Sequence, residues 1–189
     1  MLTRIVARRW MTKMTLFQWF PKTFPNGEPQ WKVDTSLLRK EYRQLQAQVH
    51  PDVVNSKGNN EDHSAQLNKA YHILSQPLAR AQYLIKCVKG VDLTNDEVSK
   101  QMTNNDPILL SNIIDVHESL TDCENENEIA IIRQENNNRL KQLIQKLDKD
   151  FECNDYDKAI STTVELKYWT NLAKAINEWT PGSRFELHH

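Results

Sequence analysis

The sequence predicts an all-α protein. Only four of its 189 residues are glycine and 26% are charged, and long stretches are rich in Leu, Lys, Gln and Glu, which lose little rotamer freedom in a helix. Apolar residues recur at helical spacing in several of these stretches. A chain of this length holds one ordinary domain or two small ones, so two compact helical units would fit.

The N-terminal half carries the pattern of a helical hairpin. Asp34 is placed to cap a helix over 35–49, and a polar loop separates this helix from a second one over 62–76. A short apolar turn over 15–20 precedes them, and another short helix follows Pro77. Two helices of similar length joined by a polar loop should pack antiparallel. The expected core residues are Leu38, Tyr42, Leu45, Val49, Leu67, Ala70, Tyr71 and Leu74.

The C-terminal half predicts a second unit. Residues 90–105 have weak periodicity and are expected to link the two units. Asp106-Pro107 is a strong helix start, because an acidic cap precedes a proline at the first helical position. The expected helices cover 107–121, 126–153 and 156–179. Three helices with short connections predict a small bundle.

The helix over 107–121 carries more apolar surface than a three-helix bundle needs. One stripe along it comprises Leu109, Ile113, Val116 and Leu120. A second stripe, about 100° away, comprises Leu110, Ile114 and His117. The second stripe predicts an exposed apolar patch for a partner. The alternative is a helix buried on two sides, because both faces can find cover in a small two-unit protein.

A basic stripe follows the helix over 35–49. Arg39, Arg43, Gln46 and His50 fall on one side of it, with Lys40 beside them. The helix must stop there, because Pro51 disfavours helical geometry at the residue before it. This pattern predicts a cationic face leading to the turn His50-Pro51-Asp52. The alternative is a solvated basic face followed by a helix-stopping proline.

Residues 1–13 have the composition of a mitochondrial presequence. Basic residues and no acidic ones occupy the first 27 positions, and apolar residues interleave with the arginines at roughly helical spacing. We therefore expect the mitochondrial matrix as the location. The alternative is a basic surface helix of the mature protein.

Other classes of protein are disfavoured. A net charge of -1 does not suit a protein that coats nucleic acid, and no apolar run is long enough to cross a bilayer. His50 and Asp52 could be drawn as an acid and a base, but no nucleophile, phosphate loop or metal-ligand spacing accompanies them. We therefore expect neither an enzyme nor a metal or cofactor site.

The residues around the turn resemble a known family. Residues 38–45 before His50-Pro51-Asp52, together with residues 67–77 after it, are similar to a J domain of the DnaJ type, which would cover 14–89. The resemblance implies that His50, Pro51 and Asp52, with Arg39, Lys40 and Arg43, engage a DnaK-type chaperone. That engagement would stimulate the ATPase of the chaperone.

The C-terminal half narrows the resemblance. A J domain, a linker over 90–105 and a three-helix domain over 106–189, with the segment 164–169 on the last helix, resemble the HscB family and its fungal mitochondrial branch. This implies that an apolar patch binds an IscU-type iron-sulfur cluster scaffold. Carried onto this sequence, the patch is Leu109, Leu110, Ile114 and Tyr168. Some relatives have a basic residue where this chain has Asn112.

Two expectations complete the interpretation. The protein would be a co-chaperone that promotes cluster transfer, and we expect it to be a monomer. The alternative function is a general mitochondrial J protein for other clients, with the C-terminal bundle as a generic interaction module.

Overall fold

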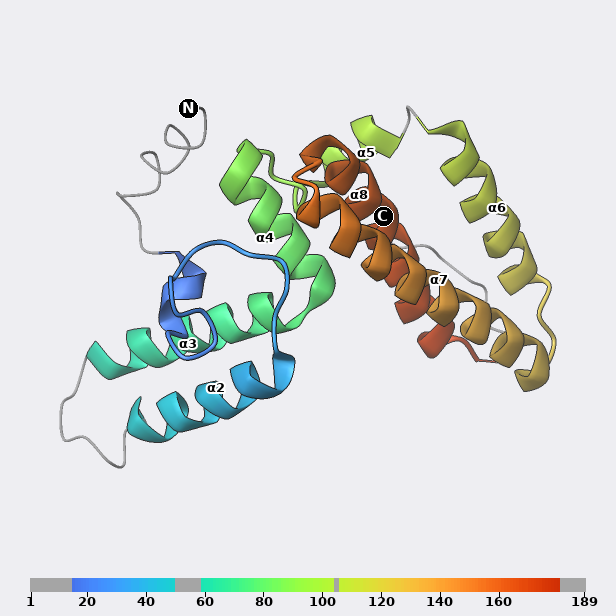
Figure 1. Ribbon diagram of the computed structural model, residues 1–189. Coiled ribbons are helices and arrows are strands. Elements are labelled where there is room, and N and C mark those ends of the chain that lie inside the picture. The colour runs from blue at the N-terminus through green and yellow to red at the C-terminus, as the bar shows by residue number, and fades with distance from the viewer. Residues whose placement is uncertain (1–14, 50–58, 104–105, 181–189) are drawn as a thin grey trace. The chain divides into compact units, whose positions relative to one another are not determined.

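The computed structural model describes residues 15–49, 59–103 and 106–180, and all regular structure among them is helical (Figure 1). The elements are the 3-10 helix η2 (Leu16–Trp19) and the α-helices α2 (Thr35–Val49), α3 (Asn59–Ser75), α4 (Pro77–Lys89), α5 (Asp96–Thr103), α6 (Pro107–Thr121), α7 (Glu126–Glu152) and α8 (Tyr156–Glu178). The predicted all-α class is confirmed. The chain divides into two compact units between Arg80 and Ala81. The predicted limits 14–89, 90–105 and 106–189 remain predictions.

The first unit is built on the predicted antiparallel hairpin of α2 and α3. The rings of Tyr42 and Tyr71 stack with their centroids 3.9 Å apart, and the Tyr42 hydroxyl donates to Asn68 Oδ1 at 2.9 Å. Leu38 and Leu74 are fully buried. α3 begins three residues before the start predicted at 62. The prediction missed this first turn because it contains asparagines, which have a low helix propensity.

The segment before α2 folds onto this hairpin through aromatic side chains. Phe17, Phe20, Phe24 and Trp31 are all buried, and the Phe17 and Phe24 rings meet edge to face at 5.0 Å. Gly27 closes the turn that follows Phe24, with φ +61°. A Cβ atom at Gly27 would lie 2.8 Å from Gln18 Cγ. Both the left-handed backbone and the close approach therefore favour glycine at this position.

The second unit is built on the antiparallel hairpin of α7 and α8, which lie side by side (Figure 1). Asn136 Nδ2 donates to the Trp169 carbonyl at 3.3 Å, and the Arg139 guanidinium lies 4.0 Å from the centroid of the Trp169 ring. Near the connection, Thr162 Oγ1 donates to Asp150 Oδ2 at 2.8 Å. The buried apolar residues of this hairpin are Ile129, Leu143, Leu147, Phe151, Ala159, Val164, Leu166, Trp169, Leu172 and Ile176.

A tight turn sets the antiparallel geometry of α7 and α8. The amide of Asp155 donates to the Asp150 carbonyl at 2.9 Å and the amide of Asn154 donates to the Phe151 carbonyl at 3.1 Å. This pair of bonds is a Schellman motif, which needs a left-handed residue just after the helix. Asn154 supplies it with φ +56°. Asp155 then caps α8 by accepting from the Lys158 amide at 3.2 Å.

Residues 96–103, which the sequence analysis placed in a linker, form helix α5 of the second unit. The buried residues of α5 are Ser99 and Thr103, which are 2% and 1% exposed. Since both are small and polar, the buried face of α5 produces no apolar period, and this is why the periodicity of the segment is weak. α5 packs mainly against α8.

Helix α6 joins the α7–α8 hairpin at few points. Only Leu109 and Leu120 are buried in its fifteen residues, whereas Ile108 is 75% and Ile114 is 55% exposed. The Asp106 carboxylate caps it by accepting from the Leu109 amide at 3.0 Å. The predicted bundle therefore consists of a tightly packed pair of helices with a third helix that is loosely attached.

The turn at Asn154 gives a test of the hairpin. Asn154→Ala should lower the free energy of unfolding by about 1 kcal/mol, because asparagine tolerates the left-handed backbone better than alanine does. The Tyr156 hydroxyl also donates to Asn154 Oδ1 at 2.9 Å, so Asn154→Gly is the control that removes this bond without the strain. Urea unfolding measures both variants. An equal loss for Ala and Gly would assign the effect to the hydrogen bond.

Candidate functional site

The basic residues predicted on α2 form one exposed surface. Arg39, Lys40 and Arg43 are all exposed. Arg39 and Arg43 lie about 40° apart around the helix, and Lys40 lies about 100° from Arg39. We call these three side chains the basic face.

The sides of α2 that carry Leu38, Glu41 and Tyr42 are covered. Leu38 and Tyr42 turn toward α3, and Glu41, on the side away from the arginines, is 2% exposed beneath the segment that precedes the helix. Its Oε1 accepts from the Lys22 amide at 2.8 Å. Its Oε2 accepts from the amide and the hydroxyl of Thr23 at 2.8 and 2.7 Å. A buried carboxylate with three donors is satisfied, so the side of α2 that is left for a partner is the opposite one, which carries the basic face together with exposed Gln44, Ala47 and Gln48.

Gln46 differs from the position predicted for it. The sequence pattern puts it on the basic stripe, but its amide donates to the Tyr42 hydroxyl at 3.1 Å and to Asn68 Oδ1. It is half-buried and therefore belongs to the polar contact between α2 and α3. The exposed basic surface is narrower than the predicted stripe.

His50, Pro51 and Asp52 lie outside the described residues. α2 ends at Val49 and α3 begins at Asn59, so the segment that carries the three residues joins the two helices of the hairpin. At the other side of this connection, the ring of His63 on α3 lies 4.7 Å from the ring of Trp19. The assignment of a chaperone-binding role to the turn remains a prediction.

The four residues predicted to bind a scaffold differ in exposure. Ile114 is 55% exposed, Leu110 and Tyr168 are half-buried, and Leu109 is 5% exposed. Leu110 and Ile114 share one face of α6, since they are four residues apart. Asn112 is half-buried. Ile108, at 75% exposed, is a further apolar residue at the start of α6 that the stripes did not include.

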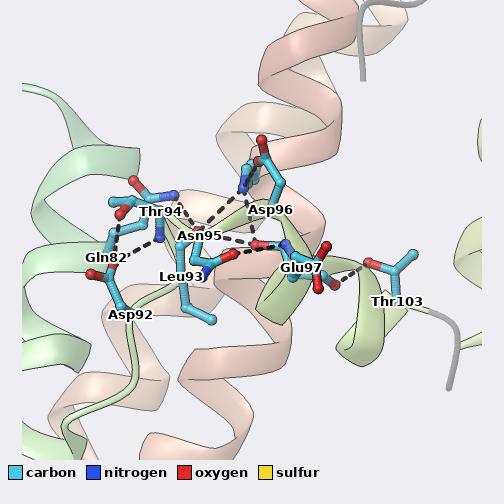
Figure 2. A network of polar contacts seen from close by, with 10 residues as sticks. Gln82, Asp92, Leu93, Thr94, Asn95, Asp96, Glu97 and Thr103 are labelled. Atoms are coloured by element: carbon cyan, nitrogen blue, oxygen red, sulfur yellow. Dashed lines mark hydrogen bonds and ion pairs between the residues drawn. The ribbon is translucent and has the colours of Figure 1, made fainter.

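A polar network that the sequence analysis did not predict connects α5 to α8 (Figure 2). Lys167 Nζ donates to Asp96 Oδ1 at 2.8 Å, to Ser99 Oγ at 3.0 Å and to the Leu93 carbonyl at 3.3 Å. The hydrogen bond from Lys167 holds the pKa of Asp96 below its usual value. About seventy residues separate Lys167 from its partners, so no local pattern could have revealed the contact.

The loop before α5 is fixed by further polar contacts. The Leu93 carbonyl also accepts from Gln82 Nε2 at 3.2 Å and from Ser99 Oγ at 3.0 Å (Figure 2). Lys86 forms an ion pair with Asp92. Hydrogen bonds from Lys86 and then Thr94 lower the pKa of Asp92 to about 2. This loop is therefore an ordered part of the second unit.

The described residues contain no group of three His, Cys, Asp or Glu side chains that could hold a metal ion. Burial raises the pKa of the Cys87 thiol, so this thiol is protonated at neutral pH and is a poor nucleophile. None of the described helices has the length and apolar character of a membrane span.

Comparisons with known proteins agree with both units. Residues 30–83 match the DnaJ domain model, and residues 105–177 match the model described as the HSCB C-terminal oligomerisation domain. The first unit thus defines a J-domain co-chaperone, a class that regulates the ATPase of a partner and is not itself an enzyme.

Comparison of the whole chain with known proteins narrows this class to one family. It is 42% identical to the mitochondrial J-type co-chaperone JAC1 of Saccharomyces cerevisiae over 100% of both chains. It is 31% identical to mitochondrial jac1 of Schizosaccharomyces pombe over 82% of this chain and 68% of that protein. This chain belongs to the HscB family of J-type co-chaperones. The names of the two fungal relatives support the predicted mitochondrial location.

Solved structures agree with the family. The structure of the Jac1 co-chaperone from Saccharomyces cerevisiae has a TM-score of 0.82 at 40% identity and covers 90% of this chain and 99% of its own. Human co-chaperone protein HscB has a TM-score of 0.74 at 26% identity and covers 88% of this chain and 82% of its own.

Proposed function

We propose that the first unit stimulates the ATPase of a DnaK-type mitochondrial chaperone while the second unit binds an IscU-type iron-sulfur cluster scaffold, so that the scaffold is delivered to the chaperone. The observation that carries the proposal is the pairing, in one chain, of an exposed basic face leading to His50-Pro51-Asp52 with a loosely packed helix that exposes apolar side chains. Relatives from mouse and human are named iron-sulfur cluster co-chaperone protein HscB.

The basic face supports binding to an acidic partner. Arg39, Lys40 and Arg43 carry like charges on the exposed side of a helix whose opposite side is buried. Such a cluster attracts and orients a negatively charged surface before contact, and this increases the association rate. The proline of the turn limits the conformations of its neighbours, so His50 and Asp52 lose little entropy on binding.

The apolar residues of α6 and α8 support binding to a scaffold. Ile114 is exposed, and Leu110 and Tyr168 are half-buried, so all three have surface that a partner could cover. Aromatic and aliphatic side chains of this kind form the centre of protein interfaces. The buried Leu109 would act by supporting Leu110.

Separate surfaces for the two partners explain how delivery would work. A scaffold held by the second unit is tethered to the unit that binds the chaperone, so its effective concentration there rises to the millimolar range typical of short links. The co-chaperone itself performs no chemistry in this scheme. We expect it to act as a monomer, which sedimentation would establish.

His50→Gln should abolish stimulation of the chaperone ATPase and leave the helical content unchanged. His72→Gln makes the same substitution at an exposed position of α3 and is the matched control. Steady-state ATP hydrolysis by the purified chaperone, with and without co-chaperone, measures the effect. Full stimulation by the His50 variant would show that the turn is not the switch.

Arg39→Glu with Arg43→Glu should slow association with the chaperone at low salt. The deficit should shrink as ionic strength rises from about 0.01 M to about 0.1 M, since the screening length falls from about 30 Å to about 10 Å. Lys141→Glu with Lys146→Glu changes the net charge equally on exposed positions of α7 and should have little effect. Association rates come from stopped-flow mixing, and a salt-independent deficit would indicate misfolding.

Replacing Leu110, Ile114 and Tyr168 together by Ala should weaken scaffold binding at least about thirtyfold, because one hot-spot truncation costs about 2 kcal/mol or more. Stimulation of the chaperone in the absence of scaffold should be retained. Ile131→Ala removes an apolar side chain that is 60% exposed on α7 and is the control. Calorimetric titration gives the affinities, and unchanged binding by the triple variant would place the scaffold elsewhere.

A further inference from the structure

Lys167 is an unusually well-partnered lysine. Its side chain is 15% exposed, and its three ammonium protons have three acceptors: a carboxylate, a hydroxyl and a main-chain carbonyl. An ammonium group has no more than three donors, so the site uses all of them. Two of the three partners, Asp96 and Ser99, belong to α5, and the third, Leu93, belongs to the loop before it.

These bonds are a main attachment of α5 to α8. The fully buried side chains of α5 are the small polar ones of Ser99 and Thr103, and its apolar residues Val98 and Met102 are only half-buried, so α5 buries little apolar area. The Thr103 hydroxyl is used within α5 itself, where it donates to the Ser99 carbonyl at 2.9 Å. The attachment of α5 therefore depends on the contact with Lys167 more than the attachment of a helix with an apolar face would depend on one polar contact.

The start of α6 depends in turn on α5. The amide of Asp106, the capping residue of α6, donates to the Thr103 carbonyl at 2.8 Å. The first turn of α6 borders an open hollow of about 430 Å³ that is lined by Leu109, by Ile160 and Val164 of α8, and by Met102 and Thr103 of α5. α6 also contacts α7 and α8 directly, so α5 is one of the elements that set the position of Leu109 and Leu110 relative to α8.

We infer that Lys167 is a positioning residue for scaffold binding: it fixes α5 on α8, and α5 holds the first turn of α6 so that Leu110 is correctly placed relative to Tyr168. The inference rests on the proposed function, since it assumes that Leu110 and Tyr168 contact the scaffold. Lys167 itself is not assigned a contact with the partner.

The chemistry of the site favours lysine over other cations. The three acceptors surround one nitrogen, which suits a compact ammonium group, whereas the donors of a guanidinium group are spread over a planar fork. Removing the ammonium group leaves the Leu93 carbonyl with donors from Gln82 and Ser99. Lys167→Met keeps the aliphatic stem and leaves no main-chain acceptor unpartnered, so this variant should fold.

Hydrogen exchange of the free full-length protein tests the attachment without a partner. In Lys167→Met the amides of α5 and of the first two turns of α6 should exchange about tenfold faster, while those of α7 keep their rates. Lys174→Met, at an exposed position seven residues further along α8, is the matched control and should exchange as the wild type does. Unchanged exchange in α6, or equal loss of protection in α7, overturns the inference.

Scaffold affinity then tests the consequence for binding. Lys167→Met should bind the apo scaffold about tenfold more weakly, Asp96→Asn should show a smaller loss, and both should stimulate the chaperone normally when no scaffold is present. Wild-type affinity in Lys167→Met overturns the inference alone. Failure of the wild-type chain to bind the scaffold overturns the proposed function and the inference together, whereas the exchange rates still decide whether α5 holds α6.

Discussion

Each unit of this molecule depends on the packing of one pair of antiparallel helices, and the elements that cover the remaining faces of each pair decide which surface is left for a partner. In the first unit, the segment before α2 is fixed by the buried carboxylate of Glu41. This leaves the side of α2 that carries the basic face uncovered. In the second unit, α5 and α6 cover the hairpin of α7 and α8 only partly, and apolar side chains of α6 stay exposed.

Buried polar contacts, rather than apolar area alone, define the positions of the covering segments. Arg80 is 6% exposed, lies 4.6 Å from the centre of the Trp31 ring and donates to the Leu74 carbonyl at 2.6 Å. Glu41 acts in the same way, and Lys167 does so through partly buried contacts with Ser99 and the Leu93 carbonyl. Contacts of this kind are directional, and a single displaced partner leaves a buried polar group unsatisfied. These polar contacts therefore specify one arrangement of the covering segments, whereas apolar packing alone would allow several.

The sequence predicted most of the helices because their apolar stripes are regular. The helix over 107–121 was predicted at its observed bounds, and the hairpin of α2 and α3 followed from two stripes and a polar loop. α5 was missed because Ser99 and Thr103 occupy its buried positions, and this pattern does not differ from that of a polar linker. The helical spacing also placed Gln46 wrongly on the basic stripe, because the angular position of a residue on a helix does not determine which neighbour its polar side chain contacts.

The sequence predicted some features of the candidate site and missed others, because only some of them depend on local sequence. The exposure of Arg39, Lys40 and Arg43 follows from the period of one helix, which local sequence contains. The difference between Leu109, which is buried, and Ile114, which is exposed, depends on neighbours that include Ile160 and Val164 of α8, which are distant in the chain. Lys167 shows the same limit, since its partners come from a segment about seventy residues away.

The sparse attachment of α6 has a consequence for how its sequence can change over evolution. Eight of its fifteen residues are exposed and only two are buried, and substitutions at exposed positions usually alter stability by about 0.5 kcal/mol or less. Selection for folding therefore constrains this helix weakly, and drift in a partner could be matched by replacements on α6 that leave the hairpin of α7 and α8 intact. A helix held in this way allows recognition to diverge between lineages without a loss of fold.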